Sequence, residues 1–296
     1  MSPEPALVCS GAPRDLGLDQ GLHFREVIRA EVERRLRGKG SGRLLGPLVG
    51  REPEVARSAR DTARFYPHMA ERAEGIARGA RVSRAEVAAL LASEYHGGGE
   101  TLCGVRSKSD GSEVWIALST EREGPLFLRR SQPENGYRSL EIGIPWRVPA
   151  LAGVNQHGLA VAASGVASSS ASLVNCAAPA ALLVQDCLQR FDRVEKAVEW
   201  CERRAAGGFA SILLADTEGV LARVDLEGDL RRVHRESDGI LLGAGEPTRV
   251  ASVEKACRAS QHLDAEALRR ILATSAGRVV VLSPGDPEQI FGDLPQ

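Results

Sequence analysis

Apolar residues recur at three- and four-residue spacing over much of the first hundred positions of the chain. This spacing places apolar side chains along one face of a helix, where they can pack on a core. It predicts helices over 18–37 and 53–78, with a glycine-rich loop between them. Ser83-Arg-Ala-Glu86 is a capping-box pattern, so a third helix is expected to begin there and to end before Gly97–Gly99. The positions that carry the stripe over 53–78 are Val55, Ala59, Ala63, Tyr66, Met69, Ala73 and Ile76.

The pattern changes at Cys103, after which short runs of strand-forming residues alternate with turn signals. Asp110-Gly111 is a strong hairpin signal between the first two of these runs, and Ser168–Ser170 is expected to be a loop. Helices followed by hairpins, further helices and further hairpins predict an α+β protein with helices packed on antiparallel sheets. The predicted strands are 103–109, 113–119, 126–130, 137–142, 151–155, 159–164, 211–216, 220–226, 230–234 and 279–282.

The second half of the chain also contains helical segments. Pro179 suits the first position of a helix, and a block over 179–204 is expected to be helical. Asp192–Glu195 has the form of a second capping box inside that block. A last helix is predicted near 265–273.

Composition excludes several function classes. The chain has 38 basic and 39 acidic residues, so its net charge of −1 provides no general attraction to nucleic acid or to an anionic membrane. No apolar run approaches the ~18 residues of a membrane-spanning helix. The N-terminus has neither the basic nor the apolar region of a signal peptide, so a cytoplasmic location is expected.

Six cysteines are present, and their spacing does not suggest a metal site. No Cys-x-x-Cys pair and no close set of cysteine and histidine with zinc spacing occurs, so we expect no metal. Cys187 and Cys201 fall in the predicted helical block, where a free cysteine behaves as a small apolar core residue.

Cys103 is the cysteine with two interpretations. It follows a glycine-rich segment and begins a predicted strand, so it could be a buried, inert thiol at the start of a sheet. It could instead be an N-terminal nucleophile, exposed by a cut between Leu102 and Cys103. The new α-amine, with a pKa near ~7.7–8.0, would then serve as general base for the thiol.

Four segments carry a family resemblance, namely Gly75–Ser83, Gly136–Ile142, Ala152–Val161 and Phe209–Leu221. They resemble the acyl-CoA:6-aminopenicillanate acyltransferase (isopenicillin N acyltransferase) group of N-terminal-nucleophile hydrolases. Gly75–Ser83 resembles a stretch of the prosegment of that family, and Gly136–Ile142 resembles one of its central strands. Ala152–Val161 is similar to an Asn-Glu-x-Gly-Leu motif, and Phe209–Leu221 to an Asp-x-x-Gly hairpin. The segments also agree with the family in their order and spacing, and the similarity extends from about residue 16 to about residue 260.

The resemblance implies a four-layer αββα sandwich of two antiparallel sheets. It implies a helical prosegment over 1–102 and a core over 103–296, which together form one structural domain and stay associated after self-cleavage. The implied activity is hydrolysis or transfer of an acyl group on a small amide, through a thioester on Cys103. No cofactor is implied, and a coenzyme A thioester is one alternative acyl donor. The resemblance leaves the oligomeric state open.

The resemblance also implies roles for residues around Cys103. Glu121 is the nearest carboxylate to an aspartate of the family and would hold the α-amine of Cys103. Ser164 stands where an asparagine often helps to hold the oxyanion, and Asn155 would fix a turn of the sheet or touch substrate. Members commonly have glycine before the cysteine and threonine or serine after it, whereas this chain has Leu102 and Gly104.

These departures leave a second function open, namely a non-catalytic, uncleaved relative that binds a small ligand or a partner protein. Outside the family motifs, the pair Arg129-Arg130 could meet a substrate carboxylate or a coenzyme A phosphate. The basic run from Arg231 to Arg235 is typical of a solvated edge strand.

Overall fold

The computed structural model describes residues 6–37, 52–93, 100–106, 113–121, 124–165, 177–243, 245–273 and 277–292. The predicted hairpin turn at Asp110-Gly111, the loop at Ser168–Ser170 and Cys176 lie outside the described residues. The described helices are α1 (Pro13–His23), α2 (Arg25–Val32), the π-helical turn η1 (Glu33–Arg37), α3 (Glu52–Phe65), α4 (Pro67–Ala80), α5 (Arg84–Ser93), α6 (Leu182–Arg190), α7 (Val194–Arg203), α8 (Pro247–Ala259) and α9 (Ala265–Ala273).

The helix predicted over 53–78 is two helices, α3 and α4, that meet at Tyr66 and Pro67. Proline has no N–H to donate and disfavours the helical conformation at the residue before it. Tyr66 accordingly has φ −133° and ψ 59°, outside the helical region. The helix predicted over 18–37 is also divided, at Phe24.

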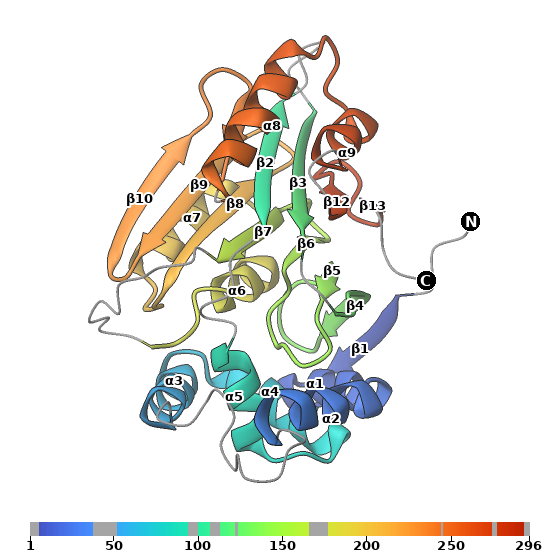
Figure 1. Ribbon diagram of the computed structural model, residues 1–296, viewed down its shortest axis with the longest axis vertical. Helices are drawn as coiled ribbons and strands as arrows, with labels where there is room; N and C mark the ends of the chain where they lie inside the picture. Colours follow the sequence, from blue (N-terminus) through green and yellow to red (C-terminus); the bar gives the residue numbers. More distant parts are fainter. Residues whose placement is uncertain are drawn as a thin grey trace.

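The strands form two sheets, and the predicted α+β sandwich class is confirmed (Figure 1). One sheet has eight described strands in the order β1-β4-β5-β6-β7-β8-β9-β10, and the other has five in the order β11-β2-β3-β12-β13. Their bounds are β1 (Leu7–Gly11), β2 (Thr101–Arg106), β3 (Val114–Thr120), β4 (Phe127–Pro133), β5 (Ser139–Gly143), β6 (Ala152–Asn155), β7 (Ala160–Gly165), β8 (Phe209–Ala215), β9 (Leu221–Glu227), β10 (Leu230–Arg235), β11 (Ile240–Leu242), β12 (Arg278–Leu282) and β13 (Ile290–Gly292).

The sheets face each other and helices cover their outer faces, which gives four layers. Strands β2 and β3 pack against β7 and β8 across the interior, while α8 and α9 lie on the outer face of the five-stranded sheet. Helices α1, α6 and α7 pack on the eight-stranded sheet, and α4 lies along α1. The pairing is antiparallel except at one edge, where β1 runs parallel to β4.

Helices α1 and α4 cross at a seam of glycines. Gly17 and Gly21 of α1 face Gly75 and Gly79 of α4, and each is buried. A Cβ atom added to Gly75 would lie 2.0 Å from the carbonyl oxygen of Arg14. Only glycine permits so close an approach of two helix backbones, so the seam fixes how α1 lies over α4.

One predicted capping box is confirmed and the other is wrong. The Ser83 amide donates to the Glu86 carboxylate at 2.8 Å, and the Glu86 amide donates to Ser83 Oγ at 3.2 Å. Helix α7 instead begins at Val194, whose amide donates to Asp216 Oδ2 at 2.9 Å, while Asp192 pairs with Lys196. A side chain distant in sequence provides this cap, so a local pattern could not identify it.

Candidate functional site

A cleft opens between the sheets at the end of the sandwich where β2 and β8 begin and β7 and β11 end. Its inner part, here called the Glu100 pocket, is a small cavity of about 50 Å³ lined by Glu100, Arg147, Ser164 and Phe209, among others. The adjoining part, called the β8–α8 groove, has about 700 Å³ and shares Phe209 and Ala210 with the pocket. Together they form the inter-sheet cleft.

Alternation along β2 decides which side chains face this cleft. Side chains of a strand point to opposite faces in turn. Leu102 packs in the core between the sheets, and a Cβ atom on Gly104 would lie 2.6 Å from Leu221 of the opposite sheet. Glu100 shares this parity and lines the cleft. Cys103 has the opposite parity, so its thiol faces the outer helices.

The thiol of Cys103 is fully buried in a second apolar cluster, together with residues of α8 and α9. Its Sγ lies 3.8 Å from Sγ of Cys257. A hydrogen bond with Cys257 and burial raise the pKa of the Cys103 thiol well above its ordinary value. A nucleophilic cysteine needs the opposite environment, one that favours the thiolate.

The expected cleavage site also lies inside a paired strand. Cys103 is opposite Ala117 of β3 on one side and Leu242 of β11 on the other. The carbonyl oxygen of Leu102 accepts a hydrogen bond from the Gly243 amide at 3.0 Å. The Leu102–Cys103 bond is therefore held on both sides, and Cys103 is the third residue of β2 rather than its start.

The structure does not bring Glu121 to Cys103. Glu121 directly follows β3, and its carboxylate is 58% exposed and 2.8 Å from Nη1 of Arg249. It lies four residues beyond Ala117, the cross-strand neighbour of Cys103, which is roughly 13 Å along a strand. Arg249 also donates to Ser119 Oγ at 2.5 Å, so this group links the start of α8 to the end of β3.

The side chain of Asn155 has four hydrogen bonds, all to backbone groups. Its Nδ2 donates to the carbonyl oxygens of Leu188 at 2.9 Å and Phe191 at 2.7 Å. Its Oδ1 accepts from the amides of His157 at 3.0 Å and Leu159 at 3.1 Å. These bonds join the β6–β7 turn to the end of α6, away from the inter-sheet cleft.

Ser164 is the predicted site residue that the structure places in the cleft. Its Oγ donates to the carbonyl oxygen of Glu100 at 2.8 Å and lies 3.3 Å from the Glu100 carboxylate. Glu100 itself is 1% exposed, which is rare for a glutamate. Sequence reasoning missed Glu100, although Gly99-Glu100-Thr101 has the glycine and threonine that flank the cysteine of the resembled family.

Charged and polar side chains line the β8–α8 groove. Asp225 accepts a hydrogen bond from Ser211 and lies 2.9 Å from Nη2 of Arg223 and 3.0 Å from Nε2 of His234. Arg223 also donates to the carbonyl oxygen of Leu242, which ties β9 to β11. The groove therefore offers hydrogen-bond donors and acceptors, and the charges of Arg223 and Asp225 in it are paired with each other.

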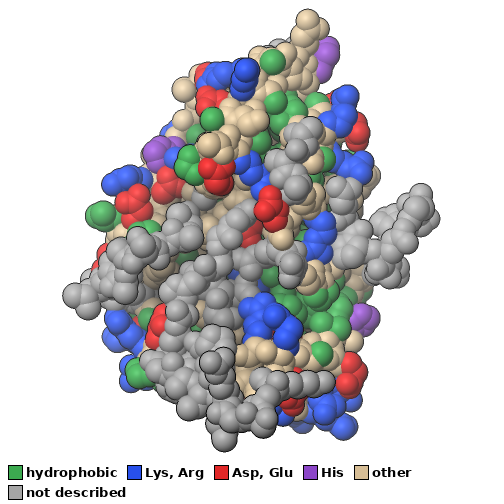
Figure 2. Space-filling model, viewed as in Figure 1, with side chains coloured by type: hydrophobic (Ala, Val, Ile, Leu, Met, Phe, Trp, Pro, Cys, Tyr) green, Lys and Arg blue, Asp and Glu red, His purple; other side chains and the backbone are tan. Residues whose placement is uncertain are grey.

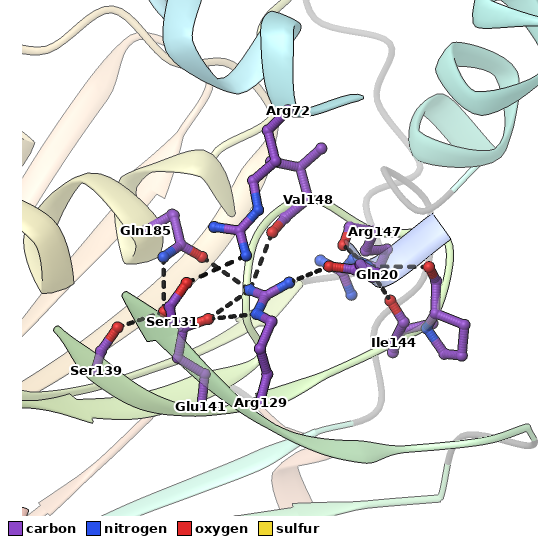
Figure 3. Close-up of polar contacts among 11 residues, drawn as sticks. Gln20, Arg72, Arg129, Ser131, Ser139, Glu141, Ile144, Arg147, Val148 and Gln185 are labelled. Carbon is purple, nitrogen blue, oxygen red and sulfur yellow. Dashed lines mark hydrogen bonds and ion pairs between the residues drawn. The ribbon is translucent and has the colours of Figure 1, made fainter. Parts of the chain in front are cut away.

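The Arg129-Arg130 pair does not reach the cleft. Arg129 is fully buried on the outer face of the eight-stranded sheet, beneath α1, α4 and α6 (Figure 3). Its Nε donates to the Glu141 carboxylate at 2.7 Å, and its Nη2 donates to Gln185 at 3.1 Å. Arg130 pairs with Glu288 at the surface. Neither guanidinium is placed to meet a substrate in the cleft.

Burial acts to raise the pKa of Glu141, but the net effect of its neighbours is to lower it below the ordinary value. The guanidinium groups of Arg129 and Arg72 lower it most, followed by hydrogen bonds from Ser139 and Gln185. The carboxylate is thus ionised and forms the negative centre of a buried polar cluster.

Two further observations concern metals and membranes. Within the described ranges, no three or more His, Cys, Asp or Glu side chains are grouped so that they could hold a metal ion. No helix in the described part of the chain is both long and apolar enough to cross a membrane. On the face shown in Figure 2, basic and acidic side chains are interspersed.

Comparison with solved structures finds an acid amidase, a penicillin acylase and a bile acid hydrolase. An N-acylethanolamine-hydrolyzing acid amidase ortholog from Caenorhabditis elegans superposes with a TM-score of 0.52 at 11% identity, covering 64% of this chain and 94% of the amidase. Penicillin V acylase from Agrobacterium tumefaciens gives 0.39 at 17% identity, covering 54% of this chain and 57% of that one. A variant of the conjugated bile acid hydrolase from Clostridium perfringens gives 0.36 at 15% identity, covering 52% and 57%. No family model and no curated protein sequence matches. The first likeness shows a shared fold.

Proposed function

We propose that this chain is an uncleaved, non-catalytic relative of the amide-hydrolysing enzymes that share its fold, and that it binds a small amide or acyl compound in the inter-sheet cleft. The observation that carries the proposal is the alternation of side chains along β2. It points the Cys103 thiol away from the cleft, whereas Glu100, directly before β2, lines the cleft. The Leu102–Cys103 bond, held inside a strand paired on both sides, supports it further.

The chemistry of the cleft suits an amide or acyl ligand. The Glu100 carboxylate can accept a hydrogen bond from an amide N–H, and Ser164 and Ser211 add hydroxyl groups that can donate or accept. The β8–α8 groove, with about 700 Å³, is of the size that small-molecule sites have. The amidase that shares the fold acts on N-acylethanolamines, and this suggests the class of ligand.

A second candidate is amide hydrolysis or acyl transfer through a thioester on Cys103, and the fold shared with an amidase favours it. Here the chain would cut itself between Leu102 and Cys103, the α-amine would act as base, and Glu121 would hold that amine. Such an enzyme resembles the isopenicillin N acyltransferase group. It requires β2 to open, so that the thiol leaves Cys257 and reaches the cleft.

Intact mass separates the two candidates. We expect the purified protein to remain one chain of 31.6 kDa. Pieces of 102 and 194 residues, absent in Cys103→Ala, would overturn the non-catalytic proposal in favour of the second candidate. If the pieces persist in Cys103→Ala, a contaminating protease made them, and the single-chain expectation stands.

A ligand assay tests the cleft itself. N-octanoylethanolamine is titrated into the full chain by calorimetry, and free ethanolamine is measured in the same samples. We expect binding without release, weakened about tenfold or more by Glu100→Gln with Ser164→Ala, and unchanged by Cys103→Ala. Release of ethanolamine that depends on Cys103 would establish the enzyme, and a lack of binding would overturn the ligand class.

A further inference from the structure

A second cavity lies on the far side of the eight-stranded sheet from the inter-sheet cleft. It has about 410 Å³ and is bounded by α1, α4, α6 and the segment that follows β4. The residues that line it include Leu16, His68, Met69, Arg72 and Gln189. Nothing in the proposed function uses this cavity.

Arg72 brings a charge to this cavity that its protein neighbours do not balance. Its side chain is 1% exposed, and Nη2 donates to Ser131 Oγ at 3.2 Å (Figure 3). Its Nε and Nη1 have no hydrogen-bond partner among the described residues. The carboxylate of Glu141, the nearest acidic member of the cluster, is already engaged by Arg129.

The cluster therefore holds two buried guanidinium groups and one buried carboxylate. Burial, and next the charge of Arg129, lower the pKa of Arg72 to about 10, so it still carries a proton at neutral pH. A buried charge is normally paired, because its loss of hydration is otherwise uncompensated. Ser131 provides only a neutral hydroxyl. The buried cluster therefore has one more positive charge than negative charges.

The other charged groups at the cavity are compensated. Asp186, fully buried, lies 2.8 Å from Nε2 of His68 and accepts from Trp200 Nε1 at 3.1 Å. Arg190 lies 3.4 Å from the same carboxylate. Glu134, on the rim, is exposed to solvent. The unbalanced charge is thus that of Arg72, and it matches a ligand with a single negative charge.

We propose that this cavity binds the carboxylate of a small monoanionic compound, with Arg72 as the charge that holds it. The cavity has an apolar wall formed by Pro13, Leu16 and Met69, so we expect the part of the ligand beyond the carboxylate to be small and apolar. Because Nε and Nη1 of Arg72 are buried, the carboxylate reaches them when side chains that line the cavity move aside.

The test uses benzoate and its neutral counterpart benzamide as probes of the full chain, at constant ionic strength. We expect benzoate to bind in calorimetry and to raise the melting temperature with concentration, and benzamide to bind at least about tenfold more weakly. Arg72→Met should weaken benzoate binding at least about tenfold. The matched control Arg130→Met, which removes an arginine from the surface on the same strand as Ser131, should leave it unchanged.

Three results would overturn the proposal: no binding of benzoate to the unmodified chain, equal binding of benzoate and benzamide, or equal binding of benzoate to Arg72→Met. If Arg72→Met does not fold, the ¹H–¹⁵N signal of the Arg72 side chain in the unmodified protein decides. That signal should shift when benzoate is added and stay unchanged with benzamide. If benzoate does not shift it, Arg72 does not contact the ligand. Glu100→Gln should leave benzoate binding unchanged, so this site and the inter-sheet cleft are tested separately.

Discussion

The thiol of Cys103 lies 3.8 Å from the thiol of Cys257, which joins the middle of β2 to α8 beneath the outer helices. Both groups are fully buried, and Ala117 of β3 lies beside them in the same apolar cluster. A thiol in these surroundings reacts slowly, because it is screened from reagents and because its protonated form is favoured.

The first prediction concerns alkylation of Cys103. Iodoacetamide should modify it in the folded chain at least about tenfold more slowly than in the chain unfolded in urea, since access requires local opening. Because its pKa is raised, the folded thiol should show no increase in reactivity near pH ~8.5, where an ordinary cysteine ionises. Peptide mass spectrometry as a function of pH measures both. Rapid alkylation at neutral pH would show an activated thiol.

A second prediction follows from the buried pair of Arg129 and Glu141. Glu141→Gln should lower the free energy of unfolding at pH 7 by about 3–5 kcal/mol, because the buried guanidinium of Arg129 then loses its carboxylate partner and that of Arg72 loses its nearest negative charge. The folded pKa of Glu141 is depressed, so its contribution is present above the unfolded pKa of ~4.3 and is lost as pH falls through the folded value.

Urea unfolding of Glu141→Gln and the unmodified chain at several pH values checks this. The difference between the two should shrink below pH ~4.3. The exposed Glu134→Gln is the matched control and should change stability by less than about 0.5 kcal/mol. A difference that does not depend on pH would mean that packing of the side chain, and not its charge, stabilises the cluster.

The third prediction concerns the glycine seam. Alanine inside a helix ordinarily stabilises by about 1 kcal/mol over glycine, yet Gly75→Ala should destabilise by about 3 kcal/mol or more. The added methyl group would lie 2.0 Å from the Arg14 carbonyl oxygen, so α1 and α4 must separate. Gly285→Ala, whose added methyl group has 3.6 Å to its nearest neighbour, serves as control in thermal unfolding. Equal melting temperatures for the two variants would contradict the close approach.

The fourth prediction separates a structural Asn155 from one that touches ligand. Asn155→Ala removes four hydrogen bonds and leaves buried backbone groups unpaired, so it should cost about 2–4 kcal/mol of stability. Its effect on N-octanoylethanolamine binding, measured at a temperature where it stays folded, should be small. The neighbouring Gln156→Ala, at an exposed position, should be neutral. A stable Asn155→Ala that loses binding would place Asn155 at the ligand.

Much of the fold could be predicted because its periodic signals are local. Alternating strands and hairpins give β3 to β10 nearly as observed. The short strands β11 and β13 were missed, since three residues carry too little pattern. The edge strand β1 was missed as well, because what makes it a strand is its pairing with β4, more than a hundred residues away.

The candidate site was harder to predict, because a shift of one residue along a strand moves a side chain from one face of the sheet to the other. Strand β2 is buried on both faces except at its last residue, so its sequence gives no alternation to show which side chains face the cleft. The sequence singled out Cys103 for its chemistry, whereas the structure places Glu100, three residues earlier, in the pocket. A buried glutamate at that position follows from tertiary packing, which a single sequence does not reveal.

The parallel edge strand β1 and the seam between α1 and α4 have a consequence for how the chain can be divided. The residues before β2 contribute a strand to the eight-stranded sheet and the helices that shield part of its outer face. Two polypeptides made separately and divided between α5 and β2 would each lack part of the apolar core that the two share. They would behave as complementing fragments, neither folding without the other, and could serve as a split reporter whose reassembly signals that two fused partners have met.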